Sequence, residues 1–206
     1  MTDNPDIQFE LNPLQDKHAR EVAALHIAGI STGFISSLGA DFVSALYEGI
    51  AQSESAFGFV VQQEEKVCGF VAFSTNLGPL YRSIILKKGW RFAFILARKM
   101  LSWRRIKKVF ETLAYPGRVK KMSLPDAELL SIVVSQDCRG RGLAHRLIDS
   151  GLQECKKRGI DSVKVMVGAA NEPANKLYQK CGFAPAGQID SHGVSSNIYI
   201  ARTNQT

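Results

Sequence analysis

The spacing of apolar residues along the chain predicts alternating strands and helices. Phe42, Leu46 and Ile50 recur every four residues, which is typical of a helix with one buried face. Runs rich in Val and Phe on both sides of the polar residues 63–66 predict a β-hairpin. The whole pattern predicts strands over 7–11, 57–62, 67–75, 127–135, 161–167, 183–189 and 195–202, and helices over 16–29, 41–51, 90–113, 142–158 and 171–181.

This order of elements predicts a mixed α/β (α+β) fold around one sheet. The 206 residues are 45% hydrophobic, which favours a single domain over 1–206. The polar, acidic start does not resemble a signal peptide, and the longest apolar run, 92–97, is too short to span a bilayer, so we expect a cytoplasmic protein. The four cysteines form no Cys-x-x-Cys pair, and we expect free thiols and no metal site.

The positive charge of the chain is concentrated in one segment. Residues 82–121 hold thirteen Lys or Arg and one acid, Glu111, whereas the rest of the chain is mildly acidic. Within this segment Phe92, Leu96, Met100 and Trp103 recur at steps of three and four, which predicts a basic amphipathic helix in an insert over about 79–121.

A glycine-rich turn follows the predicted strand 127–135 and precedes a predicted helix. Gly140 and Gly142 allow the backbone to approach an anion closely, and the first N–H groups of the helix point toward it. A P-loop would need Lys-Ser or Lys-Thr after its last glycine, and a dinucleotide fold would need an acid at the end of the next strand. Neither is present, so the turn predicts a phosphate site of another kind.

Two sequence blocks carry a resemblance to a known family. The segment Arg139-Gly-Arg-Gly-Leu-Ala144 resembles the pyrophosphate loop of the GCN5-related N-acetyltransferase (GNAT) superfamily. The segment 171–183, with Asn171, Tyr178 and Phe183, resembles a later motif of the same superfamily. The resemblance covers about 127–190 and implies a mixed, mostly antiparallel sheet flanked by helices, with acetyl-CoA bound where two neighbouring strands separate.

The resemblance also implies which residues hold the cofactor. Val134 would offer backbone groups to the pantetheine arm, and Asn171 would contact the cofactor near the point where the strands separate. The pyrophosphate would be held by the turn, which comprises Arg139, Gly140, Arg141, Gly142, Leu143 and Ala144.

Acyl transfer to an amine needs a proton donor for the departing thiolate and a route for the amine's proton. Tyr178 is the expected donor, because a phenol stays protonated at neutral pH; a tyrosine that only packs its ring is the alternative. Related enzymes often have a Glu where this chain has Leu130. Glu128, two residues earlier on the same strand face, is the expected general base, and a surface carboxylate is an almost equal alternative.

The sequence therefore predicts an acetyl-CoA-dependent N-acetyltransferase acting on a small-molecule primary amine. The basic insert favours an anionic acceptor such as an amino sugar or a nucleotide sugar; a protein N-terminus is an alternative acceptor. The insert also fits a solvated helix or peripheral membrane contact through 82–121, and nucleic acid is the least favoured partner. A non-catalytic acyl-CoA-binding or membrane-surface adaptor protein remains the rival interpretation. The sequence makes no prediction of oligomeric state.

Overall fold

The structure is a computed structural model that describes residues 8–31, 33–99, 124–191 and 194–205. Its strands form one sheet of seven in the order β1-β2-β3-β4-β5-β7-β6. Neighbouring strands are antiparallel except β4 and β5, which are parallel. The strands are β1 (Phe9–Pro13), β2 (Ala56–Gln63), β3 (Lys66–Ser74), β4 (Glu128–Val134), β5 (Ser162–Gly168), β6 (Ala184–Ser191) and β7 (Val194–Arg202).

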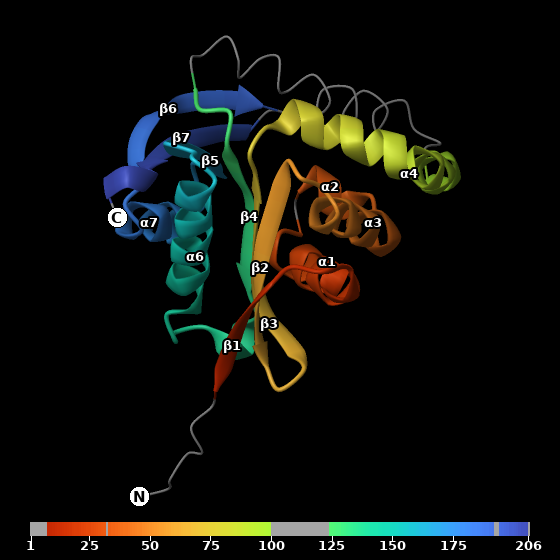
Figure 1. The fold of residues 1–206 in the computed structure, drawn as a ribbon, viewed down its shortest axis with the longest axis horizontal. Coiled ribbons are helices and arrows are strands. Elements are labelled where there is room, and N and C mark those ends of the chain that lie inside the picture. The colour runs from red at the N-terminus through yellow and green to blue at the C-terminus, as the bar shows by residue number, and fades with distance from the viewer. Residues whose placement is uncertain (1–7, 32, 100–123, 192–193, 206) are drawn as a thin grey trace, which may run out of the picture.

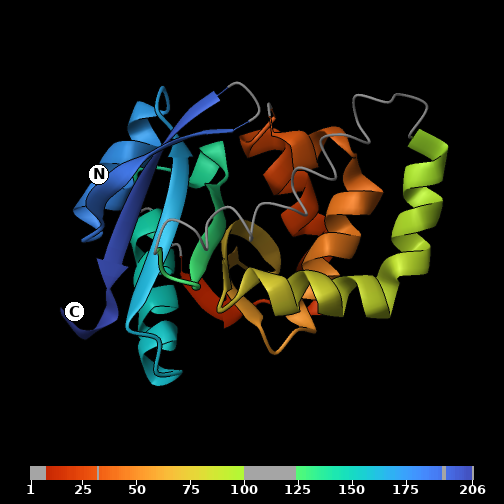
Figure 2. The ribbon, with the colours of Figure 1, turned by 90° about the horizontal axis from the view of Figure 1, so that it is seen from above.

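Helices cover both faces of this sheet (Figure 1). α6 (Leu143–Lys157) and α7 (Glu172–Lys180) lie on one face. α1 (Ala19–Gly29), α2 (Phe34–Ser37) and α3 (Ala40–Ala51) lie on the other. α4 (Leu77–Lys99) packs on α3, and Figure 2 shows that it changes direction along its length. The expected mixed, mostly antiparallel sheet flanked by helices is confirmed.

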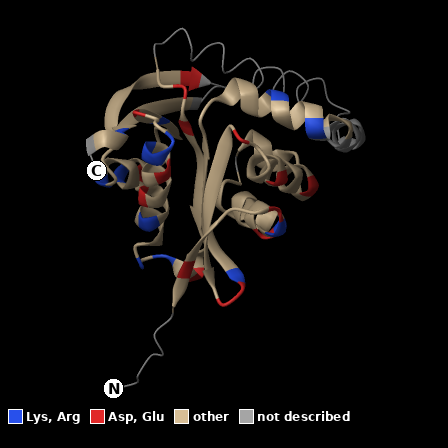
Figure 3. Ribbon diagram, viewed as in Figure 1, with Lys and Arg blue, Asp and Glu red and all other residues tan. Residues whose placement is uncertain are grey.

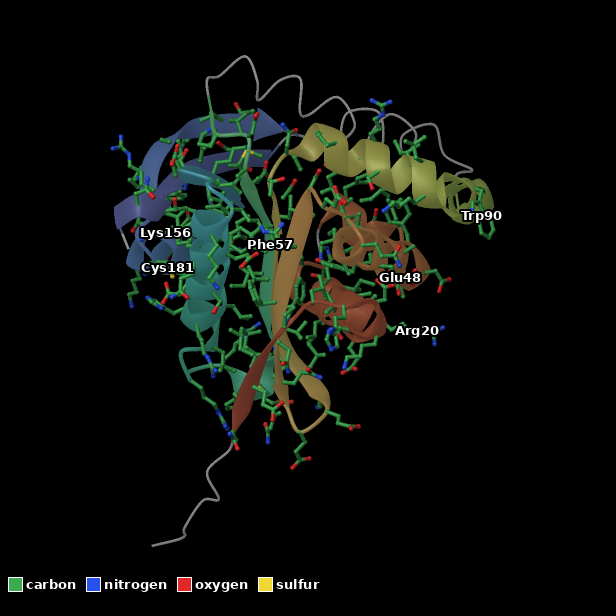
Figure 4. All side chains as sticks on the ribbon, in the orientation of Figure 1. Arg20, Glu48, Phe57, Trp90, Lys156 and Cys181 are labelled. Atoms are coloured by element: carbon green, nitrogen blue, oxygen red, sulfur yellow. The ribbon has the colours of Figure 1, made fainter. Side chains whose placement is uncertain are left out.

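Each face of the sheet has its own hydrophobic core, because the side chains of a strand alternate between faces. On β3, Val71 and Phe73 join the core beneath α6, whereas Phe70 and Ala72 join the core beneath α1 and α3. Phe57, labelled in Figure 4, stacks on Phe73 with ring centroids 5.3 Å apart. The sheet is therefore buried on both sides at its centre.

α6 lies very close to β3, and a glycine makes this approach possible. A Cβ atom at Gly151 would lie 2.0 Å from Cε2 of Phe73, which is far inside van der Waals contact. The helix therefore cannot carry a side chain at this position without moving away from the sheet. Because the turn 139–142 leads directly into α6, this packing also fixes the position of the turn.

Two elements differ from the sequence-based prediction. The basic helix begins at Leu77 rather than Trp90. Oδ1 of Asn76 accepts a hydrogen bond from the N–H of Gly78 and so caps the start of the helix. Pro79 falls in the first turn, where its missing N–H costs no hydrogen bond. The remainder of the predicted helix, beyond residue 99, lies outside the described residues. The residues between the predicted helices 16–29 and 41–51 contain a further short helix, α2.

Candidate active site

The sheet opens between β4 and β5. These parallel strands have seven residues each, but they pair only at Glu128 with Lys164 and at Leu129 with Val165. Beyond Leu129, β4 continues to pair with β3, and β5 continues to pair with β7. Among the described residues, the edge of β4 from Leu130 to Val134 therefore has no strand partner on its β5 side, and its backbone groups can receive an extended ligand.

A bulge in β4 coincides with the start of this opening. Ser131 lies opposite Ala72 and Leu129 lies opposite Phe73, so Leu130 is an extra residue in the ladder with β3. A bulge bends its strand and increases the local twist. It therefore accounts for the divergence of β4 from β5 at this point.

The glycine turn lies after the end of β4, at the open side of this gap. Gly140 has a φ of +77° and Gly142 a φ of +73°, and a Cβ atom at either position would meet nothing within 4 Å. Gly142 is the N-cap of α6 and supplies no side chain to cap the helix. The first N–H groups of α6 therefore receive no side-chain cap from Gly142 and lie at the positive end of the helix dipole, which suits an anion.

The two arginines of the turn are held by the protein itself. Nε of Arg139 donates to the carbonyl oxygen of Val134 at 3.2 Å, which ties the turn to the end of β4. The guanidinium of Arg141 lies over the ring of Phe9, 5.4 Å from its centroid. Backbone amides rather than these two side chains are therefore the main anion ligands that the turn offers.

Tyr178 lies on α7, on the face of the sheet that α6 and α7 cover. Its side chain is buried, and its ring contacts Phe183 and Tyr199 at centroid distances of 5.7 and 6.5 Å. Burial, with a smaller contribution from Cys181, raises the pKa of its hydroxyl above the ordinary value. Its raised pKa keeps the hydroxyl protonated at neutral pH, and no hydrogen bond joins it to another described residue.

Glu128 lies on the opposite face of β4, where the opening begins. It is 7% exposed, and its carboxylate lies 3.4 Å from Nζ of the buried Lys164. Lys164 also donates to the carbonyl oxygens of Pro125 and Asp126. Burial and the charge of Glu128 together raise the pKa of Tyr81 on α4 to about 12. Glu128 is thus part of a buried ionic cluster rather than a surface carboxylate.

Asn171 and Asn175 hold α7 in place. Oδ1 of Asn171 accepts a hydrogen bond from the N–H of Ala174 and so caps the helix. Asn175 is buried: its Nδ2 donates to the carbonyl oxygens of Gly168 and Asn171, and its Oδ1 accepts from Asn197 and from the Tyr199 hydroxyl. Asn175, which sequence reasoning missed, therefore locks the helix that carries Tyr178 against β5 and β7.

A buried polar chain that the sequence did not reveal reaches β4 from the other side. Nδ1 of His26 and the hydroxyl of Tyr47 are 2.7 Å apart, and the same hydroxyl is 2.7 Å from Oγ of Ser131. Nε2 of His26 is buried without a partner among the described residues. Because an unpaired buried N–H is rarer than an unpaired acceptor, we assign the proton to Nδ1, so that Tyr47 donates to Ser131.

Two further side chains near the glycine turn, His145 and Cys138, could in principle take part in a site. His145 is half exposed, and its Nδ1 lies 3.0 Å from a carboxylate oxygen of Asp149. All four cysteines are free and buried, Cys138 among them. In the part of the chain that the structure describes, no group of three or more His, Cys, Asp or Glu side chains is arranged to hold a metal ion.

A mixed sheet that opens between two parallel strands, with a glycine turn and an uncapped helix at the open side, defines the acetyltransferase class of α/β folds. The profile of the Acetyltransferase (GNAT) family matches residues 32–183 of this chain. The chain belongs to this family, whose members use acetyl-CoA as the acyl donor. The family suggested by the two motifs is thus confirmed.

Known relatives match about a third of the chain or less. Mycothiol acetyltransferase of Corynebacterium aurimucosum is 41% identical over 59 residues, which are 29% of this chain and 19% of that protein. The [Ribosomal protein bS18]-alanine N-acetyltransferase of Escherichia coli is 32% identical over 68 residues, or 33% of this chain and 46% of that protein. The chain thus matches less than half the length of these relatives.

Solved structures share the fold over nearly the whole chain. The ribosomal-protein-S18-alanine N-acetyltransferase from Escherichia coli has a TM-score of 0.61 at 16% identity, with 95% of this chain and 94% of that chain covered. Arabidopsis thaliana NAA60 in complex with acetyl-CoA has a TM-score of 0.60 at 14% identity, with 96% and 99% covered. At these identities the likeness concerns the fold alone.

Proposed function

We propose that this chain transfers an acetyl group from acetyl-CoA to a primary amine. The observation that carries the proposal is the opening between β4 and β5, which leads to the uncapped start of α6 and to two glycines with positive φ. A thioester with a long arm and a pyrophosphate fits both features. The arm needs an exposed strand edge, and the pyrophosphate needs an anion site.

The chain's own residues divide the binding task. The backbone of β4 near Val134 aligns the pantetheine arm, and the amides of residues 139–144 hold the pyrophosphate. Arg139 braces the turn against Val134. Asn171 contacts the bound molecule near the opening while it caps α7. Acetyl-CoA supplies the activated acetyl group when bound.

The chemistry uses the two faces of the opening. On one face Tyr178, kept protonated by burial, donates a proton to the departing sulfur. On the other face Glu128 accepts the proton of the amine through water. The ion pair with Lys164 holds the Glu128 carboxylate at the start of the opening.

The acceptor is an amine, and we propose an anionic small molecule such as an amino sugar or nucleotide sugar. The basic residues of the insert support this choice; among them Arg82 and Lys87 are described and exposed. The printed names of one relative and of one similar solved structure, both from Escherichia coli, favour an alternative, since each is an N-acetyltransferase of a ribosomal-protein alanine. A protein N-terminus is therefore the second acceptor class to test.

A thiol-release assay with acetyl-CoA tests the proposal. The acceptors to compare are a nucleotide-linked amino sugar, a peptide that begins with alanine, and spermidine. Release of CoA that depends on one of these amines, with an acetylated product of matching mass, is the expected result. Tight binding of acetyl-CoA without turnover on any of them would instead support a non-catalytic acyl-CoA-binding protein.

A further inference from the structure

The described part of the chain exposes three large apolar side chains, and all three lie on α4. Ile85 is 53% exposed, Leu86 74% and Trp90 78%. Leu86 and Trp90, four residues apart, lie on the same side of the helix, and Ile85 lies on the adjoining side. Trp90, labelled in Figure 4, stands at the outer end of the side chains drawn on α4. We call these three residues the α4 patch.

The α4 patch is not needed to attach the helix to the fold. The opposite side of α4 supplies Leu77, Leu80 and Ile84, which are buried in the core shared with α3. Ile84 sits so close to Gly49 that a Cβ atom there would lie 2.9 Å from its Cγ1. The helix therefore has one apolar side that packs and a second that faces solvent, and an exposed cluster of this kind marks a surface for another partner.

The charge around the α4 patch indicates the partner. Arg82 and Lys87 are exposed beside the patch, and Nζ of Lys87 also donates to the carbonyl oxygen of Gln52 at 3.2 Å. Figure 3 shows basic but no acidic positions on the described α4. The sequence of α4 contains no Asp or Glu and six basic residues, namely Arg82, Lys87, Lys88, Arg91, Arg98 and Lys99. A partner that covers this side must therefore be apolar and negatively charged at once.

An anionic phospholipid surface has both properties. Its phosphates attract Lys and Arg, and its interfacial region accepts Trp, Leu and Ile side chains from a helix that lies in the plane of the membrane. A free anionic molecule would use the cations but leave the apolar side chains in water. A second copy would bring two basic helices together, which is electrostatically unfavourable. No helix in the described residues is long and apolar enough to cross a bilayer, so the mode is surface attachment.

We propose that α4 binds the surface of anionic membranes, with Ile85, Leu86 and Trp90 in the interfacial region and Arg82 and Lys87 at the lipid phosphates. This proposal develops the peripheral membrane contact that the sequence suggested for 82–121 and does not depend on acetyl transfer. A negative result here would leave acetyl-CoA binding and turnover untouched.

Fluorescence of Trp90 gives the most direct test. The chain has two tryptophans, so Trp103→Phe leaves Trp90 as the only one. We expect its emission to shift to shorter wavelength, and the protein to sediment, with vesicles of phosphatidylcholine and phosphatidylglycerol but not with vesicles of phosphatidylcholine alone. Leu86→Asp in this background should weaken vesicle binding by about tenfold or more, because it places a carboxylate in the interface.

Matched charge variants test whether vesicle binding depends on the basic residues of α4 or on the positive charge of the protein in general. Arg82→Gln with Lys87→Gln removes two charges beside the α4 patch and should weaken vesicle binding about tenfold. Lys157→Gln with Lys180→Gln removes two exposed charges from α6 and α7 and should leave it nearly unchanged. Unchanged circular dichroism and acetyl-CoA affinity show that each variant is folded.

Three results would overturn the proposal. The first is the absence of binding to the phosphatidylglycerol vesicles. The second is binding that Leu86→Asp and the α4 charge variant leave as strong as before. The third is a concentration-dependent dimer in sedimentation velocity that Leu86→Asp abolishes, which would assign the α4 patch to a second copy of the chain.

Discussion

Valine in place of Gly142 should abolish acetyl-CoA binding without unfolding the protein. Gly142 has a φ of +73°, where a β-branched residue is strained, and this strain costs about 1–2 kcal/mol of folding stability. A Cβ atom there meets nothing within 4 Å, so no clash adds to the cost. We expect the added methyl groups instead to obstruct the approach of a phosphate to the first N–H groups of α6.

The loss of binding can be estimated from the hydrogen bonds that are blocked. A hydrogen bond between a backbone N–H and a charged phosphate contributes about 1.5–3 kcal/mol. Loss of two such bonds therefore weakens binding by about 3–6 kcal/mol, which is more than roughly 10²-fold in Kd. Isothermal titration calorimetry with acetyl-CoA measures this change, and thermal unfolding measures the strain.

Gly159 provides the matched control at the other end of α6. Its φ is +72°, and a Cβ atom there also meets nothing within 4 Å. Gly159→Val should therefore lose the same stability, about 1–2 kcal/mol, but keep its affinity for acetyl-CoA. If the two variants bound acetyl-CoA equally well, the assignment of the pyrophosphate to the start of α6 would be wrong.

Three other substitutions or conditions test separate parts of the structure. Tyr178→Phe should lower kcat by about 10²-fold or more while the affinity for acetyl-CoA stays unchanged, because only the proton donor is lost. Steady-state kinetics measures this effect, and an unchanged kcat would exclude Tyr178 as the proton donor. Gly151→Val should cost at least about 1–3 kcal/mol in denaturant unfolding and weaken acetyl-CoA binding, since its Cβ atom would overlap Phe73. Burial lowers the pKa of His26 from 6.5 to about 4. Between pH 6.5 and pH 4 this histidine is therefore protonated in the unfolded chain but neutral in the folded one. The free energy of unfolding should therefore fall by up to about 3 kcal/mol as the pH drops through that range. His26→Gln should remove this part of the pH dependence, which urea unfolding at several pH values measures.

Much of the fold could be predicted because its elements have strong local patterns. The four-residue repeat of Phe42, Leu46 and Ile50 matches α3, and the Val-rich and Phe-rich runs match the hairpin of β2 and β3. The start of α4 was predicted wrongly because the helix is initiated by the side chain of Asn76, and Gly78 and Pro79 next to it are ordinarily residues of a turn.

The candidate site was predicted unevenly for a physical reason. Gly142 and Tyr178 belong to contiguous motifs, so the sequence alone singles them out. The ion pair of Glu128 with Lys164, by contrast, joins neighbouring strands 36 positions apart in the chain, and no periodicity reveals it. The contacts of Tyr47 with His26 and Ser131 likewise link three elements, which only the folded chain brings together.

A crystal structure with bound acetyl-CoA tests the central claim most directly. We predict that the pyrophosphate contacts the backbone amides of residues 139–144, that the pantetheine arm runs along β4 in the opening beside β5, and that the thioester sulfur lies near the hydroxyl of Tyr178. A cofactor bound elsewhere on the chain, with β4 and β5 closed on each other, would contradict the account.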